Sequence, residues 1–475
     1  MRRPNILFIC TDQQHARAMG NAGNAWVKTP HLDALAQAGT TFAKAFCAFP
    51  LCSPSRASHF TGLMPHQHGV CGNTASIPEG RLPVSLGHIF RDSGYETIWA
   101  GKWHVPDVYP QAPDGVPGFR TVPYHTGPDD ETVDRLYTDE AIQYLGQAHE
   151  TPFLLSLQLH NPHNICLPFH EDLPLDFAFP DDDQLPPLPA NHGHQSREPD
   201  VMRELRIDEM KGYTRVHKWD DQAWQTWRDL YGHYTESGDP DAGDRLLQLK
   251  DKRWDSVDWR CYRYLYFHLV ETLDVQVGRV LQALRDNGLE DNTLVLFTSD
   301  HGDGMGAHKW TRKMTLYDES VHVPMIMRWP GVIPAGVTDT SHLVSGIDIL
   351  PTLCDYAGID LPSELPGQSL KPWIEDPETR GREYVVAEVK SIPQISDTTW
   401  HGRMLRTHRH TYVLFDQGAN REMLFDLEAD PLETINLAAD PASHATKAAL
   451  RAQLRDWCRQ TADDFIHSTD YAGDQ

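Results

Sequence analysis

Four short apolar runs, each followed directly by polar residues that can do chemistry, constrain the fold of this chain most strongly. The runs are residues 6–10, 97–100, 153–159 and 293–298. Continuous apolar runs that are bounded by turns are typical of strands buried on both faces, as in parallel sheets. The polar clusters behind them contain Asp12, Lys102, His163 and Asp300.

Helical patterns lie between these runs, at residues 29–38, 86–93, 132–148 and 262–287. This alternation predicts an α/β fold with a large, mixed but mostly parallel sheet between layers of helices. In such sheets, ligands bind beyond the carboxyl ends of the strands. We therefore expect the polar clusters to converge, although they are far apart in the chain.

The length of 475 residues exceeds what one core usually covers, so two domains, or one large domain with an appendage, are expected. Residues 1–375 are predicted to form the catalytic domain. Within it, residues 164–255 break the alternation and are interpreted as an insertion on the substrate side. Residues 376–475 are predicted to form a smaller α+β domain. Its expected elements are short antiparallel strands at 384–389, 403–407, 411–415 and 422–427 and a final helix at 445–461.

The charge of the chain limits the classes of partner. The formal net charge is −25, from 42 basic and 67 acidic side chains, which argues against a nucleic-acid partner. An anionic substrate would therefore have to meet a local basic pocket. No run approaches the roughly 20 apolar residues of a membrane span, so no membrane partner is expected.

The 8 cysteines form no Cys-x-x-Cys pair, which favours reduced thiols inside a cell. The apolar run at residues 6–10 is also too short for the hydrophobic part of a signal peptide. Both observations predict a cytoplasmic protein. The sequence leaves open whether the chain forms a homo-oligomer.

One cysteine stands in the pattern Cys-x-Pro-x-Arg, formed by Cys52, Pro54 and Arg56. Pro54 suits the first turn of a helix, where its missing N–H would be unsatisfied in any case. Cys52 would then face the free N–H groups of a helix N-terminus, where anions are favoured. A buried cysteine before an ordinary helix explains the short pattern equally well when it is taken alone.

Other segments join this pattern in one order along the chain. They are residues 94–104, which end in Lys102-Trp103-His104; Asp274 and Gly278; Ser299-Asp300-His301-Gly302 with Gly306, His308, Trp310, Lys313 and 322–324; and 423–437. Together with Cys52 they resemble the type I formylglycine-dependent sulfatases of the alkaline phosphatase superfamily. The resemblance covers nearly the whole chain and implies the alkaline-phosphatase-like fold.

The resemblance implies that a maturation enzyme oxidises Cys52 to formylglycine. The hydrated aldehyde has two hydroxyls on one carbon. One attacks sulfur to give a sulfate hemiester, and the other later loses its proton and expels the sulfate. An unmodified thiolate would instead give a thiosulfate ester with no easy exit. Arg56, one helical turn on, is implied to hold the hydrated aldehyde.

The resemblance also implies one divalent cation, held by Asp12, Gln13, Asp300, His301 and the group made from Cys52. The Asp-His pair resembles iduronate-type sulfatases, and the Asp-Gln pair resembles choline sulfatases and phosphonate monoester hydrolases. Ca²⁺ is the ion expected from the family. The amide and the imidazole leave Mg²⁺ or Mn²⁺ open, because Ca²⁺ prefers oxygen ligands. A simple turn at Asp300 and a helix cap at Asp12 are the structural alternative.

The resemblance also implies roles for two lysines and two histidines. Lys102 and Lys313 are implied to bind the sulfate, where the transition state gathers negative charge. His104 is implied to take the proton from the remaining hydroxyl. His163 is implied to bind sulfate and to act as general acid near the ester oxygen.

Two further features allow both a binding and a structural interpretation. His308 is predicted to bind substrate, although it could instead support Lys313. The tryptophans around the insertion could stack on a sugar, although a packed helical face is the commoner explanation. They are Trp219, Trp224, Trp227, Trp254 and Trp259.

These features predict a sulfuric ester hydrolase that acts on a small-molecule or saccharide sulfate. The alternative is a phosphonate or phosphate mono- or diester hydrolase with the same formylglycine site, since these esters share shape and charge with sulfate esters. A catalytically silent glycan binder would be favoured by loss of Cys52, Lys102 or Asp300, and all three are present. An alkaline phosphatase would need ligands for two metals, and ligands for only one are evident.

Overall fold

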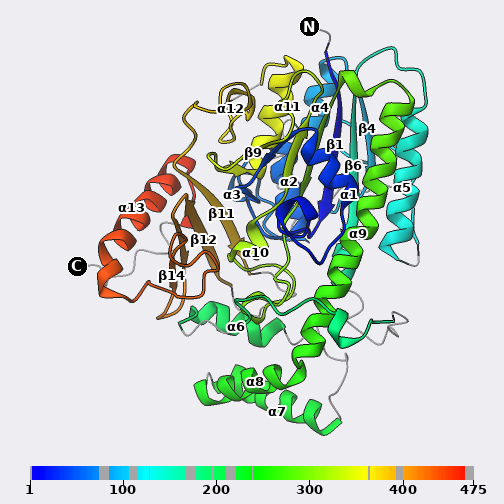
Figure 1. Ribbon diagram of the computed structural model, residues 1–475. Coiled ribbons are helices and arrows are strands. Elements are labelled where there is room, and N and C mark those ends of the chain that lie inside the picture. Colours follow the sequence, from blue (N-terminus) through cyan, green and yellow to red (C-terminus); the bar gives the residue numbers. More distant parts are fainter. Residues whose placement is uncertain are drawn as a thin grey trace.

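The computed structural model describes residues 3–73, 85–105, 115–127, 129–166, 178–193, 197–209, 221–237, 239–361, 364–391 and 399–465. A sheet of 8 strands forms its centre, in the order β5-β4-β6-β1-β7-β8-β2-β9 (Figure 1). The strands are β1 Asn5–Asp12, β2 Thr40–Phe42, β4 Glu96–Gly101, β5 Arg120–Thr121, β6 Phe153–Pro162, β7 Thr293–Ser299, β8 Met325–Arg328 and β9 Val337–Asp339. A further pair, β3 Ala45–Phe46 and β10 Val344–Ser345, forms a small sheet.

The four predicted strands are neighbours in this sheet, as β4, β6, β1 and β7. They run parallel to one another, whereas β8 is antiparallel to β7 and to β2. The predicted mixed, mostly parallel sheet is therefore confirmed. In the register of β1 and β7, Thr11 pairs with Ser299. This register brings the next residues, Asp12 and Asp300, to the same edge of the sheet.

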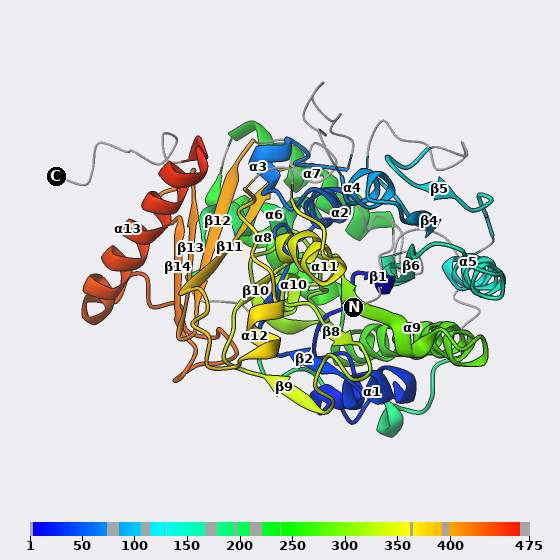
Figure 2. The ribbon, with the colours of Figure 1, turned by 90° about the horizontal axis from the view of Figure 1, so that it is seen from above.

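Helices cover both faces of the sheet (Figures 1 and 2). Along β1, Ile6 and Phe8 point into one core, whereas Leu7 and Ile9 point into the other. The first core includes α2 Cys52–Thr61, α4 Leu86–Asp92 and α11 Ile349–Ala357. The second includes α1 Pro30–Gln37, α5 Asp130–Leu145 and α9 Ser256–Asp286. Burial on both faces explains why these strands are continuously apolar.

The C-terminal part is an antiparallel sheet of 4 strands in chain order. It consists of β11 Tyr384–Lys390, β12 His401–Thr407, β13 His410–Phe415 and β14 Glu422–Asp426, with α13 His444–Thr461 on its outer face (Figure 2). Leu405 and Leu414 pack with Leu454 of α13. Side chains of the opposite face, such as Met404 and Val413, join the core of the main sheet. A domain boundary at residue 375 stays a prediction.

The described part of the insertion contains α6 Asp200–Glu209, α7 Asp221–Ser237 and α8 Pro240–Arg253, below the sheet in Figure 1. Ile207, Trp227 and Leu246 form its own small core. Trp227 stacks on Tyr231, so its packing favours the structural interpretation. Trp219 and the side chain of Trp224 lie outside the described residues.

Trp254 and Trp259 pack edge to face, with their ring centres 4.6 Å apart. Short helices complete the fold: α3 Pro65–His68, α10 Asp318–Val321 and α12 Lys371–Glu375. In the described parts of the chain, no helix is both long and apolar enough to span a bilayer.

Candidate active site

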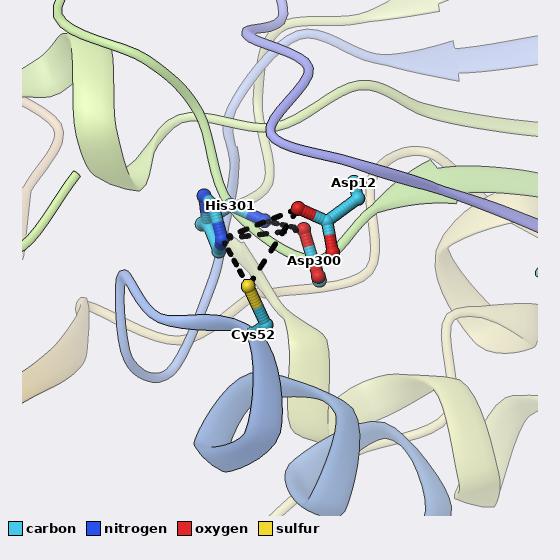
Figure 3. Close-up of side chains that lie close together, drawn as sticks. All are labelled: Asp12, Cys52, Asp300 and His301. Atoms are coloured by element: carbon cyan, nitrogen blue, oxygen red, sulfur yellow. Dashed lines mark hydrogen bonds and ion pairs between the residues drawn. The ribbon is translucent and has the colours of Figure 1, made fainter. Parts of the chain in front are cut away.

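Cys52 is the first residue of α2, as the Pro54 pattern predicts, and its side chain is fully buried. Figure 3 shows the sulfur pointing from the start of the helix toward Asp12, Asp300 and His301. Cys52 Sγ lies 2.9 Å from Lys313 Nζ, 3.3 Å from His301 Nε2 and 3.6 Å from Asp12 Oδ1. Burial opposes ionisation, but the cations around the thiol, Lys313 first, hold the pKa of Cys52 well below its usual value.

Arg56 joins the two buried carboxylates of this site. Its Nη2 lies 3.1 Å from Asp12 Oδ2, and its Nε lies 2.9 Å from Asp300 Oδ2. The guanidinium also donates to Gln158 Oε1 and to the carbonyl of Lys102. Arg56 therefore fixes the carboxylates, and a direct contact with the hydrated aldehyde stays a prediction.

The donor set fits a divalent cation. Ligating atoms of Asp12, Cys52, Asp300 and His301 all lie within 4.8 Å of one another. His301 Nδ1 lies 2.9 Å from the carbonyl oxygen of Gly302, which leaves Nε2 directed at the centre of the group. Burial, followed by the charge of Asp12, raises the pKa of Asp300 to about 6. A cation at this point would relieve the repulsion between the carboxylates.

Gln13 adjoins this group but its amide is held from the other side. Gln13 Nε2 donates to Asp303 Oδ2 at 2.7 Å and to Cys166 Sγ at 3.4 Å. Its backbone N–H donates to Asp300 Oδ1, and its φ of 73° lies in the left-handed region. Whether the amide oxygen binds the cation stays a prediction.

Asp303 is a buried residue of this site that the sequence analysis did not identify. Burial raises its pKa to about 6, and Tyr262 Oη donates to its Oδ2 at 2.8 Å. Its place two residues after His301 in the chain was the only available signal. Asn161, at the end of β6, was also missed as an individual residue. Its side-chain nitrogen and oxygen are buried and have no hydrogen-bond partner among the described residues.

Both predicted lysines approach Asp12, with Lys313 Nζ 3.9 Å from its Oδ1. Lys102 Nζ lies 2.8 Å from Asp12 Oδ2, whereas Lys313 contacts the sulfur of Cys52. Burial disfavours both ammonium groups, but Asp12 and Cys52 offset it and raise the pKa of each lysine. The pair supplies the local basic pocket that an anionic substrate needs in a protein of net charge −25.

The predicted histidines are placed differently. His163 follows β6, and burial together with Lys102 and Lys313 holds its pKa well below its usual value. His104 follows β4 and is exposed, and its carbonyl accepts a hydrogen bond from the hydroxyl of Ser53. The backbone of His104 therefore lies beside the first turn of α2.

His308 has its contacts elsewhere. Its imidazole is 2% exposed, stacks on Tyr317 with ring centres 4.1 Å apart, and lies 3.1 Å from the amide nitrogen of Asn191. Burial lowers its pKa to about 4. This position disfavours the predicted contact with substrate and favours a supporting role.

Comparison with known proteins agrees with this geometry. The sulfatase family matches residues 4–359, and the C-terminal family of N-sulphoglucosamine sulphohydrolase matches residues 306–460. A Delta 4,5-hexuronate-2-O-sulfatase of Bacteroides thetaiotaomicron is 31% identical over 98% of this chain and 90% of its own. An N-acetylglucosamine-6-O-sulfatase of the same organism is 27% identical over 95% and 86%.

Solved structures give the same result. That of a 2-O GAG sulfatase, 29% identical, superposes with a TM-score of 0.79 over 98% of this chain and 94% of the other. The phosphonate monoester hydrolase of Agrobacterium radiobacter, 24% identical, shares the fold with a TM-score of 0.73 over 98% and 97%. The family match over residues 4–359, which is most of the chain, shows that this protein belongs to the sulfatase family.

Proposed function

We propose that the protein hydrolyses a sulfate monoester carried by a saccharide, with formylglycine made from Cys52 as the nucleophile. The observation that carries this proposal is the position of Cys52 Sγ, at a helix N-terminus and 2.9 Å from Lys313 Nζ. Sulfatases that act on sugars are among the relatives, which supports a saccharide as the organic part of the substrate.

Formylglycine at position 52 would supply a hydroxyl nucleophile, and a divalent cation held by Asp12, Asp300 and His301 would polarise the sulfate. The residues of the chain would bind and orient the ester around these groups. Lys102 and Lys313 bind the sulfate oxygens, where negative charge accumulates in the transition state. Arg56 keeps Asp12 and Asp300 in place beneath them.

We assign proton transfer to two histidines. His163 donates toward the ester oxygen that leaves, because the negative charge of a bound sulfate would offset Lys102 and Lys313 and raise the lowered pKa of this histidine. His104, whose backbone lies beside the first turn of α2, takes the proton of the second hydroxyl. The exposed position of His104 leaves its imidazole accessible from solvent.

Steady-state rates on matched esters test the substrate class. The panel contains sulfated mono- and disaccharides, choline sulfate, and an aryl sulfate and an aryl phosphonate with the same aryl group. Mass spectrometry of the peptide that contains residue 52 shows which preparations carry formylglycine. A Cys52→Ala variant provides the background rate.

We expect the highest kcat/KM for a sulfated saccharide and activity in proportion to the fraction of modified protein. A higher rate on the phosphonate than on the matched sulfate would favour the alternative hydrolase. Full activity of protein with unmodified Cys52 would contradict the formylglycine mechanism.

The identity of the cation and the cellular setting are further parts of the proposal. We propose Ca²⁺, with Mg²⁺ and Mn²⁺ as the alternatives. Adding each ion back to chelator-treated enzyme and measuring affinity and rate distinguishes them. A partner enzyme that modifies Cys52 and residence in the cytoplasm stay proposals, which co-expression and cell fractionation test.

A further inference from the structure

The loop that carries Lys313 has an unusual backbone. Five residues of the loop other than glycine have positive φ angles, between 47° and 74°. They are Met305, His308, Lys309, Arg312 and Met314. Such conformations persist only where the surrounding structure enforces them, and they cluster at functional sites. The groups that enforce this loop therefore help to determine where the amine of Lys313 lies.

One support comes from the loop itself. The N–H of Gly304 donates to the carbonyl of Arg312 at 2.7 Å, and that of Gly306 donates to the carbonyl of Trp310 at 2.8 Å. These bonds close the loop on itself but leave other carbonyls at its tip to be satisfied from outside.

The second support comes from the insertion. Arg206 of α6, fully buried, donates from Nη2 to the carbonyl of His308 at 2.7 Å and from Nη1 to that of Lys309 at 3.3 Å. Its guanidinium also lies over the ring of Trp310, 4.1 Å from the ring centre. Three successive residues of the loop thus contact one side chain.

Glu198 fixes this arginine in turn. Its two carboxylate oxygens accept from Arg206 Nε at 2.6 Å and Nη2 at 2.8 Å. Glu198 Oε1 also accepts from Trp310 Nε1 and Tyr317 Oη. A planar guanidinium with several donors can bond to the carboxylate and to both carbonyls while it stacks on the indole ring, and a lysine ammonium cannot.

We propose that Arg206, held by Glu198, is a positioning residue that places Lys313 at the nucleophile. The insertion then contributes to catalysis indirectly, because its buried Arg206–Glu198 ion pair fixes the backbone of the Lys313 loop. This inference rests on the proposed role of Lys313 in the sulfatase reaction.

A double-mutant cycle with Lys313 tests the inference. Single-turnover rates are measured for the wild type, Arg206→Met, Lys313→Met and the double variant, on aryl sulfates with good and poor leaving groups. Cation content, the modification of residue 52 and thermal stability are measured for each. Arg203→Met, on the same helix, is the matched control, because Arg203 pairs with Asp244 of α8.

We expect Arg206→Met to lower the rate by about 10²-fold, the order of loss that a small misplacement of a catalytic group can cause. The loss should be larger for poor leaving groups and should disappear in the Lys313→Met background. Arg206→Lys should not restore the rate, and Arg203→Met should leave it unchanged. If Arg206→Met does not fold, Glu198→Gln takes its place in the cycle and should show the same coupling to Lys313.

Arg206→Met, or Glu198→Gln in its place, could lower the rate equally in the wild-type and the Lys313→Met backgrounds. That result would mean general structural damage, and it would overturn this inference but not the proposed function. A Lys313→Met variant with full activity would overturn both the role of Lys313 and its positioning by Arg206. The two failures are therefore distinguishable.

Discussion

Lys313 Nζ lies 2.9 Å from Cys52 Sγ, although the two residues are 261 positions apart in the chain. Lys102 Nζ lies 2.8 Å from Asp12 Oδ2, and Lys313 Nζ also lies 3.9 Å from Asp12 Oδ1. The two cations thus approach the nucleophile position from separate segments.

Lys313→Met should slow the release of the alcohol by about 10²–10³-fold, since it removes a cation that stabilises developing charge. His104→Ala should instead release about one equivalent of alcohol rapidly and then stall, because the proton of the second hydroxyl would not be removed. Rapid-mixing kinetics with an aryl sulfate distinguishes the two. The absence of a burst in His104→Ala would show that the histidine has another role.

The central strands could be predicted from sequence because both of their faces are buried. β1, β4, β6 and β7 all read as continuous apolar runs, and their polar ends mark the edge of the sheet where the site lies. The start of α9 was predicted six positions late. Asp255 caps that helix by accepting from the N–H groups of Val257 and Asp258, and this cap belongs to a polar stretch without apolar periodicity.

Contacts between distant segments were not predictable in the same way. The bond between Gln13 and Asp303 joins residues 290 positions apart, and no local pattern marks Asp303 as its partner. The same holds for Arg206, which donates to two backbone carbonyls of the Lys313 loop in addition to its pairing with Glu198. Backbone acceptors carry no side-chain identity, so a single sequence holds no record of them.

Arg56→Met should destabilise the protein by about 3–5 kcal/mol, because it removes the guanidinium that pairs with the buried carboxylate of Asp300 and leaves Asp12 with Lys102 and the more distant Lys313. Added Ca²⁺ should recover part of this loss, since it neutralises the same carboxylates. Urea unfolding with and without the ion measures both effects. Arg120→Met, which breaks an exposed pair with Glu96, is the control and should cost no more than about 1 kcal/mol. Equal stability of Arg56→Met and the wild type would contradict this account.

Asp303→Asn should weaken cation binding and destabilise the fold by about 1–3 kcal/mol. The carboxylate accepts from Gln13, from Tyr262 and from the N–H of Met305. An asparagine has one acceptor oxygen, so at least one buried donor would lose its partner. Calorimetric titration of the ion measures the first effect. Tyr262→Phe, which removes a donor instead of an acceptor, should have the smaller effect, and an unchanged ion affinity in Asp303→Asn would exclude this role for the residue.

Two helical glycines should respond to alanine in opposite directions. A Cβ on Gly278 of α9 would overlap the imidazole of His31, so Gly278→Ala should cost about 1–3 kcal/mol. Among the described residues, no atom outside the adjoining helix backbone lies within 4 Å of such a Cβ on Gly232 of α7, and Gly232→Ala should stabilise by about 0.5–1 kcal/mol. Thermal unfolding measures both. Adding His31→Ala should relieve the first defect, and the explanation fails if the double variant is no more stable than Gly278→Ala.

The stability that His66 contributes should depend on pH. Its Nδ1 lies 2.6 Å from Glu388 Oε1, and its Nε2 lies 3.1 Å from the carbonyl oxygen of Thr461. Two acceptors favour the doubly protonated ring. Although burial opposes the charge, the bond to Glu388 and the nearby Asp463 raise the pKa of His66 above its usual value. Arg403, which contacts Glu388 and Asp463, stays charged throughout.

A raised pKa in the folded state means that the protonated form is stabilised by folding. The contribution is therefore fully present below the unfolded pKa of about 6.5 and is lost as the pH rises through the higher folded value. The difference in unfolding free energy between the wild type and His66→Gln should accordingly shrink from pH 6 to pH 9. The comparison is His68→Gln, because burial lowers the pKa of His68 to about 3. Its contribution is therefore present above the unfolded pKa of about 6.5 and weakens as the pH falls below that value, opposite to that of His66. Urea unfolding at several pH values should give a difference that shrinks with rising pH for His66 and one that grows with rising pH from pH 6 for His68. A difference for His66 that does not shrink would contradict its raised pKa in the folded protein.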